Sequence, residues 1–288
     1  MEHPFETASG TVIGHKHAAD GVNNQDSSLV ARTSAALIAV VCDGCTSGHG
    51  GSSHNDVGAQ LGARITTSAI IDSMMWHGRL DWVDVRNRVA DDLRRAMSLL
   101  RVTEPDHVVV ADYLLFTTVA IVITNEVAEV AALGDGVVFI NGNRLAMRPV
   151  VGGAPAYVAY NLTSKTMTPE QLRYDVIATM PTSELATFLI GSDGCDDLIA
   201  AEHKCIPGQS AIVGPIDRFW TDDAYFKNSD AVRRKLVITN GGVWRPTQVA
   251  GGVWHQQGYL SDDTTLVTGR RKVAAAMANA VSKVTGDV

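Results

Sequence analysis

The sequence lacks the features of a membrane-bound or exported chain. No segment reaches the roughly 18 consecutive apolar residues that a membrane-spanning helix needs. Its amino-terminal stretch, MEHPFETASG, is not a basic segment followed by an apolar one, as a secretory signal would be. We therefore expect a cytoplasmic protein that does not contact a membrane.

Positive charge is scarce relative to negative charge. The 288 residues include 24 Lys and Arg against 31 Asp and Glu, which gives a net charge of −7. Proteins that bind nucleic acid or an anionic membrane surface usually carry a basic cluster, and this sequence contains none. Neither partner is expected. An excess of acid is instead compatible with a site that binds cations.

Cysteine is also rare, with Cys42, Cys45, Cys195 and Cys205 in the whole chain. Cys42 and Cys45 form a C-x-x-C pair, which occurs in zinc sites. No second close pair and no His-x-x-x-His partner accompanies it, so a structural zinc site is disfavoured. We expect reduced thiols that do not bind metal.

The first third of the sequence contains short strands followed by two long helices. Apolar residues at every second position predict strands near 9–14, 27–32 and 36–42. Apolar residues at every fourth position predict a helix over 55–76 and, after a capping Asp81, a second helix that extends to Leu100. Both helices should pack against the core.

The rest of the sequence is rich in β-forming residues. Asn141-Gly142 between two apolar runs is a strong hairpin signal, so we expect an antiparallel meander in the middle of the chain. A final helix is expected at 271–283. The expected strands lie at 116–123, 127–133, 137–140, 144–147, 173–180, 186–191 and 264–269.

Residues 200–258 are harder to interpret. They contain five glycines between Gly241 and Gly258 and three of the tryptophans. Long irregular segments in compact domains are usually functional, so we expect an insertion or lid here. The order of the elements favours an α+β layered sandwich over alternating βαβ units. With 45% hydrophobic residues the chain can bury a full core, and we expect a single domain over 1–288.

Several apolar runs begin or end at an aspartate, most often beside a glycine. A single Asp-Gly is a common turn, but repeated junctions of this kind are difficult to explain as turns alone. If the strand ends converge, the carboxylates would repel one another unless divalent cations neutralised them, and oxygen ligands select Mg²⁺ or Mn²⁺ over zinc. The aspartates at these junctions are Asp26, Asp43, Asp135, Asp193 and Asp262.

Together these junctions resemble the motifs of the metal-dependent PPM family of serine/threonine phosphatases, the protein phosphatase 2C-like family. The motifs occur in family order between about residues 8 and 270. They are Asn24-Gln25-Asp26, Val41-Cys42-Asp43-Gly44, Thr117-Thr118, Gly134-Asp135-Gly136, Ser192-Asp193-Gly194 and Asp262-Asp263-Thr264-Thr265. The resemblance implies a four-layer αββα sandwich of antiparallel sheets flanked by helices. It also implies two Mg²⁺ or Mn²⁺ ions at one end of the sandwich.

By position, the resemblance assigns a role to each acidic motif. It implies that Asp43 bridges both ions, that the carbonyl of Gly44 completes one site, and that Asp193 and Asp262 hold the other. Asp26 would fix the attacking water. The implied reaction is direct hydrolysis of phosphoserine and phosphothreonine on proteins by metal-activated water. A serine/threonine kinase system would then be the functional counterpart.

Many members of the family bind a third ion. In this sequence the resemblance implies that its ligands are Asp135, Asp193 and Asp197.

The sequence departs from the family pattern where substrate is bound. Gly21 stands where many members have a phosphate-binding arginine, Gln25 replaces a glutamate, and Cys45 follows the Asp-Gly motif directly. These departures resemble a divergent bacterial branch. They leave open a weakly catalytic sensor or scaffold that binds phosphoprotein, or a phosphatase of a small phosphorylated metabolite.

A cluster of histidines near the first motifs offers a replacement for the missing arginine. His17, with Lys16 second, is the candidate for binding the substrate phosphate, and a protonated His17 could also assist the leaving alkoxide. His15, His49 and His54 are more simply explained as solvated loop residues. Thr117 and Thr118 are equally well explained as β-branched strand residues.

Overall fold

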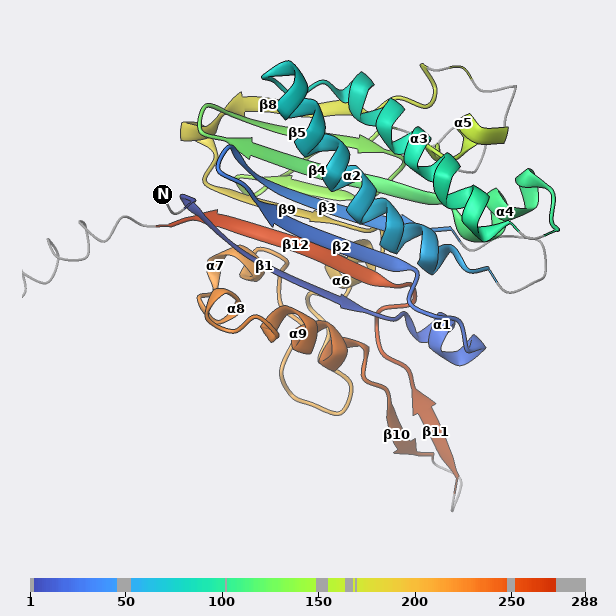
Figure 1. Cartoon of the computed structure of the whole chain (residues 1–288). Helices are drawn as coiled ribbons and strands as arrows, with labels where there is room; N and C mark the ends of the chain where they lie inside the picture. Colours follow the sequence, from blue (N-terminus) through green and yellow to red (C-terminus); the bar gives the residue numbers. More distant parts are fainter. Residues whose placement is uncertain are drawn as a thin grey trace, which may run out of the picture.

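Two antiparallel sheets lie face to face, and helices cover both outer faces (Figure 1). This computed structural model describes residues 3–45, 53–101, 103–148, 155–163, 168, 170–247 and 252–272. The arrangement is the α+β, four-layer αββα sandwich that the motif resemblance implied.

The two five-stranded sheets contain strands from both halves of the chain. One sheet has the order β1 (Phe5–Val12), β12 (Thr264–Arg271), β9 (Thr187–Gly191), β6 (Val137–Ile140) and β7 (Asn143–Arg144). The other has the order β2 (Asp26–Arg32), β3 (Ala36–Gly44), β4 (Phe116–Thr124), β5 (Val127–Leu133) and β8 (Asp175–Pro181). Each pairing between these strands is antiparallel.

The central strand β3 explains why its sequence is a continuous apolar run. Successive side chains of a strand point to opposite faces. Leu37 and Val41 lie in the core between the two sheets, whereas Ile38 and Val40 lie in the core beneath the helices. Both faces of β3 are therefore buried, so an alternating apolar and polar pattern is not required.

The long predicted helices form one outer layer. They are α2 (Asn55–His77) and α3 (Trp82–Leu100), and the carboxylate of Asp81 caps α3 by accepting hydrogen bonds from the Val83 and Asp84 amides. The shorter α4 (Asp106–Tyr113) and α5 (Tyr160–Thr163) lie beside them (Figure 1). On the opposite face lie α6 (Cys195–Ala200), α7 (Arg218–Thr221), α8 (Ala224–Lys227) and α9 (Ala231–Asn240). A 3₁₀ turn at Thr182–Glu184 precedes β9.

Some predicted boundaries are wrong. β1 starts at Phe5 rather than near residue 9, and a short helix, α1 (His15–Asp20), follows it. β7 comprises Asn143–Arg144 instead of the predicted 144–147, although the Leu145 amide still donates to the Val138 carbonyl of β6 at 2.9 Å. The predicted hairpin turn is confirmed, with positive φ at Asn141 and Gly142.

The end of the chain is only partly described. Residue 271 ends β12, and the remainder of the helix predicted at 271–283 falls outside the described residues, except for residue 272.

Within 200–258, most of the described chain packs onto the sandwich. Phe219, Trp220, Val232 and Leu236 are buried against the sheet that contains β1 and β12. Beyond α9, a hairpin of β10 (Val243–Pro246) and β11 (Val253–Gln256) projects from the body (Figure 1). A lid role for this region and a single domain over 1–288 remain predictions.

No described helix combines the length and the apolar character that crossing a membrane requires.

Candidate metal centre

The register of the central sheet places two acidic residues side by side. Asp26 at the start of β2 pairs with Asp43 near the end of β3, and Asp43 pairs with Thr117 of β4. Asp26 is buried, and its Oδ2 accepts a hydrogen bond of 2.6 Å from the Ser192 hydroxyl. Its Oδ1 is also buried and accepts no hydrogen bond within the described part of the chain. An anionic oxygen therefore lies beside Asp43 without a donor.

Three further loops bring their aspartates to the same place. Asp135 lies between β5 and β6, Asp193 follows β9, and Asp262 precedes β12. Burial raises the pKa of Asp43 well above its usual range, and the charges of Asp26, Asp193, Asp262 and Asp135 raise it further. The structure therefore brings together the junction aspartates that the sequence singled out.

The pKa values of three other acids of this cluster, Asp26, Asp135 and Asp193, are also raised. Burial raises the pKa of Asp26 to about 7, against the lowering effect of its hydrogen bond with Ser192. Partial burial, followed by the charges of Asp135 and Asp262, raises the pKa of Asp193 to about 6. The pKa of Asp135 is raised by burial. Burial is the largest cause of each shift, and the charges of neighbouring carboxylates add to it for Asp26 and Asp193.

These residues fit a divalent cation. The oxygen of Asp26 without a donor and the mutually repelling carboxylates both call for positive charge, and carboxylate oxygens suit Mg²⁺ or Mn²⁺. As a set, the carboxylates of this cluster are farther apart than the ligands of an occupied metal site would be. Among the described residues, only His17, Asp262 and Asp263 place three ligand atoms within 4.8 Å of one another. A third ligand would therefore have to approach Asp43 and Asp193, whose carboxylates already lie within hydrogen-bonding reach of each other, to complete a site around an ion.

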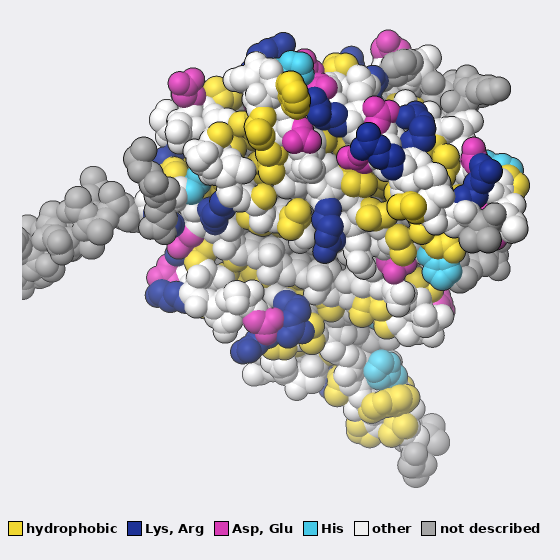
Figure 2. Space-filling view, viewed as in Figure 1, with side chains coloured by type: hydrophobic (Ala, Val, Ile, Leu, Met, Phe, Trp, Pro, Cys, Tyr) yellow, Lys and Arg dark blue, Asp and Glu magenta, His cyan; other side chains and the backbone are white. Residues whose placement is uncertain are grey.

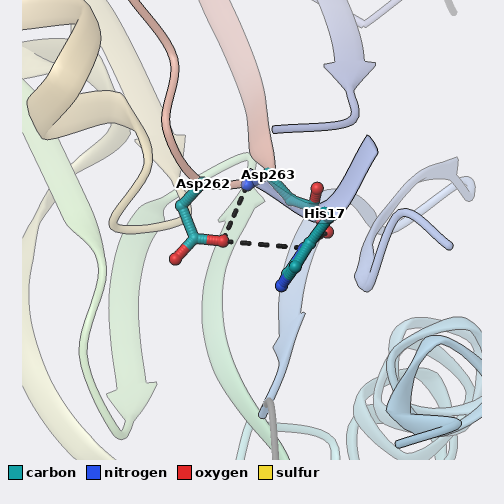
Figure 3. Close-up of side chains that lie close together, drawn as sticks. All are labelled: His17, Asp262 and Asp263. Atoms are coloured by element: carbon teal, nitrogen blue, oxygen red, sulfur yellow. Dashed lines mark hydrogen bonds and ion pairs between the residues drawn. The ribbon is translucent and has the colours of Figure 1, made fainter. Parts of the chain in front are cut away.

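Asp263 is better suited to holding the protein in place than to binding metal. Its buried carboxylate accepts backbone hydrogen bonds from Gly14 at 2.7 Å and Gln25 at 2.5 Å. It also pairs with His17 Nδ1 at 2.9 Å (Figure 3). Both carboxylate oxygens are thus occupied, and the carboxylate ties α1 to the start of β2.

The same contact orients His17. The hydrogen bond with Asp263 raises the pKa of His17, although burial acts in the opposite direction. His17 Nδ1 also lies 3.8 Å from Asp262 Oδ1, whose carboxylate accepts the Asp263 amide at 2.8 Å (Figure 3). The imidazole is therefore held at the edge of the acidic cluster, with Nδ1 directed at the carboxylates.

Sequence reasoning missed the part played by Asp263. The Asp262-Asp263 pair was visible, but only Asp262 was assigned a role. The sequence contained a signal for this role, because Asp263 directly precedes the buried residues of β12. A carboxylate at such a position needs hydrogen-bond donors. Ser192 was likewise identified only as part of a motif, although its hydroxyl donates a hydrogen bond to Asp26 Oδ2.

Two candidate residues lie at the margin of the cluster. Lys16 is exposed on α1. Asp197 Oδ2 accepts hydrogen bonds from both the amide and the hydroxyl of Ser261, at 2.7 and 2.5 Å. Asp197 thus holds the residue that immediately precedes Asp262, which is compatible with either a supporting or a direct role.

Glycine is required at position 44. A Cβ there would lie 2.5 Å from the carbonyl oxygen of Asn55 and 2.8 Å from that of Gln25. The buried Asn55 side chain also donates to the carbonyl of Cys45 at 2.6 Å, which fixes the exit of β3. The close approach that Gly44 permits brings the end of β3 against both neighbouring segments.

The cysteines and histidines are placed as follows. None of the four cysteines, including the C-x-x-C pair, forms a disulfide. Cys42 Sγ lies 3.7 Å from the Thr118 hydroxyl in the core. His54 stacks on Tyr113 with ring centroids 5.2 Å apart, and His49 lies outside the described residues.

The family model of protein phosphatase 2C matches residues 13–225. The chain belongs to the protein phosphatase 2C family. This match includes the Asp26, Asp43, Asp135 and Asp193 motifs, whereas Asp262 lies beyond it. No curated protein sequence matches the chain.

Solved structures of phosphatases are similar to the chain at low sequence identity, and the first two below share its fold. A bacterial serine phosphatase is 12% identical with a TM-score of 0.52, covering 94% of this chain and 100% of that one. Serine/threonine phosphatase Stp1 from Staphylococcus aureus is 13% identical with a TM-score of 0.50, covering 95% and 97%. The catalytic domain of the phosphatase PstP, described in complex with 2 manganese ions, is 15% identical with a TM-score of 0.44, covering 92% and 97%.

Proposed function

We propose that the protein is a Mg²⁺- or Mn²⁺-dependent phosphatase of phosphoserine and phosphothreonine residues in proteins. The observation that carries this proposal is the set of aspartates at the strand ends, whose burial and mutual repulsion raise their pKa values. Membership of the protein phosphatase 2C family supports phosphatase chemistry in general. The departures at Gly21 and Gln25 bear on the substrate rather than on the acids.

The aspartate cluster would hold the ions. Asp43, at its centre, would bridge two ions, with the carbonyl of Gly44 completing one site and Asp193 and Asp262 holding the other. Asp135 and Asp197, with Asp193, would serve a third ion. When bound, these cations would supply water activation and neutralisation of phosphate charge.

Asp26 and His17 would act on either side of the reacting phosphate. Ser192 holds Asp26 Oδ2, which leaves the buried Oδ1 to accept a hydrogen bond from the attacking water and so orient it. Asp263 orients the His17 ring through Nδ1, and the Nε2–H of a protonated imidazole would donate to a phosphate oxygen or protonate the leaving alkoxide. Lys16, exposed on the same helix, is the second candidate for contacting phosphate.

A weakly catalytic phosphoprotein sensor is the second candidate, because one observation favours it. Gly21 adopts a left-handed conformation, with φ of 69°, that ends α1. The backbone conformation alone thus favours glycine where a phosphate-binding arginine was expected. A protein that lacks this arginine could bind phosphoprotein and hydrolyse it slowly.

A metal titration on the full chain tests the proposal. Mn²⁺ or Mg²⁺ should switch on hydrolysis of an aryl phosphate and of phosphoserine and phosphothreonine peptides, and Asp43→Asn should abolish both. Small phosphorylated metabolites assayed beside the peptides distinguish the metabolite alternative. Tight, metal-dependent binding of phosphopeptide without turnover would favour the sensor, and hydrolysis that persists in EDTA would contradict the proposed metal centre.

A further inference from the structure

The β10–β11 hairpin has one apolar face that is open to solvent. Residues paired across an antiparallel hairpin point to the same side. Trp244 pairs with His255, and Pro246 pairs with Val253 two positions along, so these four side chains share one face. All four are exposed, and the Trp244 and His255 rings lie 4.8 Å apart between centroids. We name this set the hairpin face.

The opposite side of the hairpin is more polar. It carries Val243, Arg245, Trp254 and Gln256, and Arg245 Nε donates to Gln256 Oε1 at 2.6 Å. Each side therefore carries a tryptophan and a valine, but only the hairpin face has all four of its side chains exposed. Figure 2 shows hydrophobic side chains and a histidine gathered on the visible side of the projecting hairpin.

The hairpin exposes large apolar side chains, as the end of α2 and the surface of α3 also do. Trp244 is 67% exposed and Val253 is 63% exposed. In the described part of the chain, neither edge of the hairpin pairs with a third strand. A two-stranded hairpin alone is marginally stable in water, and a contiguous exposed apolar surface marks an interaction site.

Hydrogen bonds connect the base of the hairpin to the segments beside the candidate metal centre. The Asn240 side chain, at the end of α9, donates to the Ile13 carbonyl at 2.8 Å and accepts the Leu260 amide at 3.2 Å. The Leu260 carbonyl in turn accepts the His15 amide at 2.9 Å, at the start of α1. The same few residues thus hold the hairpin, the helix that carries His17, and the segment that leads to Asp262.

The charge of this region suits a phosphorylated partner. Residues 231–260 contain no Asp or Glu, although the whole chain has 31, and they include Arg233, Arg234, Lys235 and Arg245. Arg233 and Arg234 pair with Asp230, whereas Arg245 lies on the hairpin itself. An acidic phosphopeptide would meet no repulsion from acidic residues of this segment.

We propose that the hairpin face binds the polypeptide that flanks the phosphorylated residue of a protein substrate, an inference that rests on the proposed function. Gln256 and Asp262 are six residues apart, a length that an extended chain spans in about 20 Å. A substrate strand of similar length reaches from the acidic cluster to the hairpin. It adds to the open edge by main-chain hydrogen bonds, and its apolar side chains cover Trp244 and Val253.

The test compares two phosphothreonine peptides of equal length. One carries β-branched and aromatic residues on both sides of the phosphothreonine, and the other carries glycine and serine there. The double variant Trp244→Ala, Val253→Ala should raise KM for the first peptide about tenfold, as loss of a buried aromatic anchor does. KM for the second peptide and turnover of an aryl phosphate should stay unchanged. Trp76→Ala, which removes a 77% exposed tryptophan at the end of α2, is the matched control and should change neither.

The outcomes separate the two levels of the proposal. Absence of aryl phosphate turnover in the wild type would reject the proposed function, whereas normal turnover with no preference between peptides would reject the hairpin face alone. An equal loss on every substrate in the double variant would assign the hairpin a structural role and also overturn the inference. The inference would also be overturned if the double variant kept the peptide preference but lost self-association in light scattering, because the hairpin face would then bind a second copy of the chain. Loss of lipid vesicle binding with an unchanged peptide preference would overturn it too, because the face would then bind lipid.

Discussion

Aspartates have opposite pKa shifts at the candidate metal centre and on the outer helices. Before α9, Asp230 accepts hydrogen bonds from Arg233 at 2.6 Å and Arg234 at 2.7 Å, and these bonds lower its pKa to about 2. At the ends of the central strands, burial raises the pKa of Asp26 to about 7. An aspartate therefore loses its proton at low pH on the surface, whereas at the strand ends it loses its proton only near neutral pH.

The difference lies in the neighbours that the fold supplies. Helical spacing places an arginine three and four residues after Asp230, so the surface acid is satisfied by its own segment. Strand register places Asp26 beside Asp43, so the site acid meets another acid. Repulsion of this kind is costly in the metal-free protein, and its persistence in a well-packed sheet points to a cation that offsets it.

The largest expected effect comes from removing a charge at the centre of the cluster. Asp43→Asn, Asp193→Asn and Asp262→Asn should each lower kcat for an aryl phosphate by about a thousandfold, because each removes a metal ligand and with it several kcal/mol of charge stabilisation. The metal-free variants should melt at a temperature no lower than the metal-free wild type, since repulsion is relieved. Calorimetric titration with Mn²⁺ should show the loss of metal affinity directly.

Asp230→Asn is the matched control for these variants. It removes a paired carboxylate far along the sequence from the motifs, so kcat and metal affinity should not change. Near-native turnover at saturating Mn²⁺ in any one of the three site variants would show that this residue is not a ligand.

A smaller effect is expected from the residue that contacts phosphate under the proposed function. His17→Ala should lower kcat/KM for a phosphopeptide about ten- to a hundredfold, because it removes a charge-assisted hydrogen bond of about 1.5 to 3 kcal/mol. Metal affinity should change little. Identical kinetics for variant and wild type between pH of about 6 and 9, which spans the imidazole titration, would refute the role and favour the sensor.

Asp263→Asn tests whether His17 depends on its carboxylate partner. The amide can retain one backbone hydrogen bond but not the charge beside His17, so kcat/KM should fall by a similar factor. Combined with His17→Ala, the second substitution should add little, because both remove the same interaction. Full additivity of the two effects would mean that Asp263 acts on the site without His17.

The metal-free protein should lose stability as pH rises. Folding raises the pKa of Asp26 to about 7 and that of Asp193 to about 6, so the folded state holds these protons more tightly than the unfolded chain. The stabilising contribution of these two groups should therefore be complete below pH of about 4 and be lost as pH rises through about 6 and 7. Urea denaturation in EDTA measures this slope, and saturating Mn²⁺ should flatten it. A slope of the opposite sign would show that the cluster is not repulsive.

Asp230 provides the contrast within the same titration. Its pKa is lowered in the fold to about 2, so its contribution is present above pH of about 4 and is lost as pH falls toward 2. Asp230→Asn should therefore leave the slope between pH 5 and 8 unchanged.

Local patterns in the sequence were sufficient to predict the layers of the fold and most of the aspartates of the candidate site. β5 and β6 run over the predicted residues, because their apolar runs are bounded by clear turns. α3 matches the four-residue spacing of its buried Val85, Val89 and Leu93. α2 forms over the predicted residues, but the side chains that it buries are mostly small, such as Ala59 and Ala63. The strand-ending aspartates could be named because a carboxylate after a buried run is unusual in itself.

What could not be predicted depends on partners distant in sequence. Asp263 is defined by the amides of Gly14 and Gln25, which lie more than two hundred residues away. The short helix α1 has little apolar periodicity, and it is held by Leu260 and Asp263. The hairpin face appears only once the register pairs Trp244 with His255.

The smallest expected effect comes from substituting Gly21. Two variants at this position separate the cost of its left-handed backbone conformation from the effect of adding a positive charge. The left-handed φ of 69° at Gly21 and the open space around it mean that a side chain would strain the backbone without a clash. Gly21→Ala should therefore lower the free energy of unfolding by about 1 kcal/mol, measured by urea denaturation. Gly21→Arg carries the same backbone cost, so any difference in kcat/KM between the two variants reports the guanidinium alone. In a His17→Ala background, Gly21→Arg should recover part of the lost kcat/KM for a phosphopeptide, because an arginine there would restore a donor to the phosphate. Equal kinetics for the alanine and arginine variants would show that position 21 does not reach the substrate in this chain.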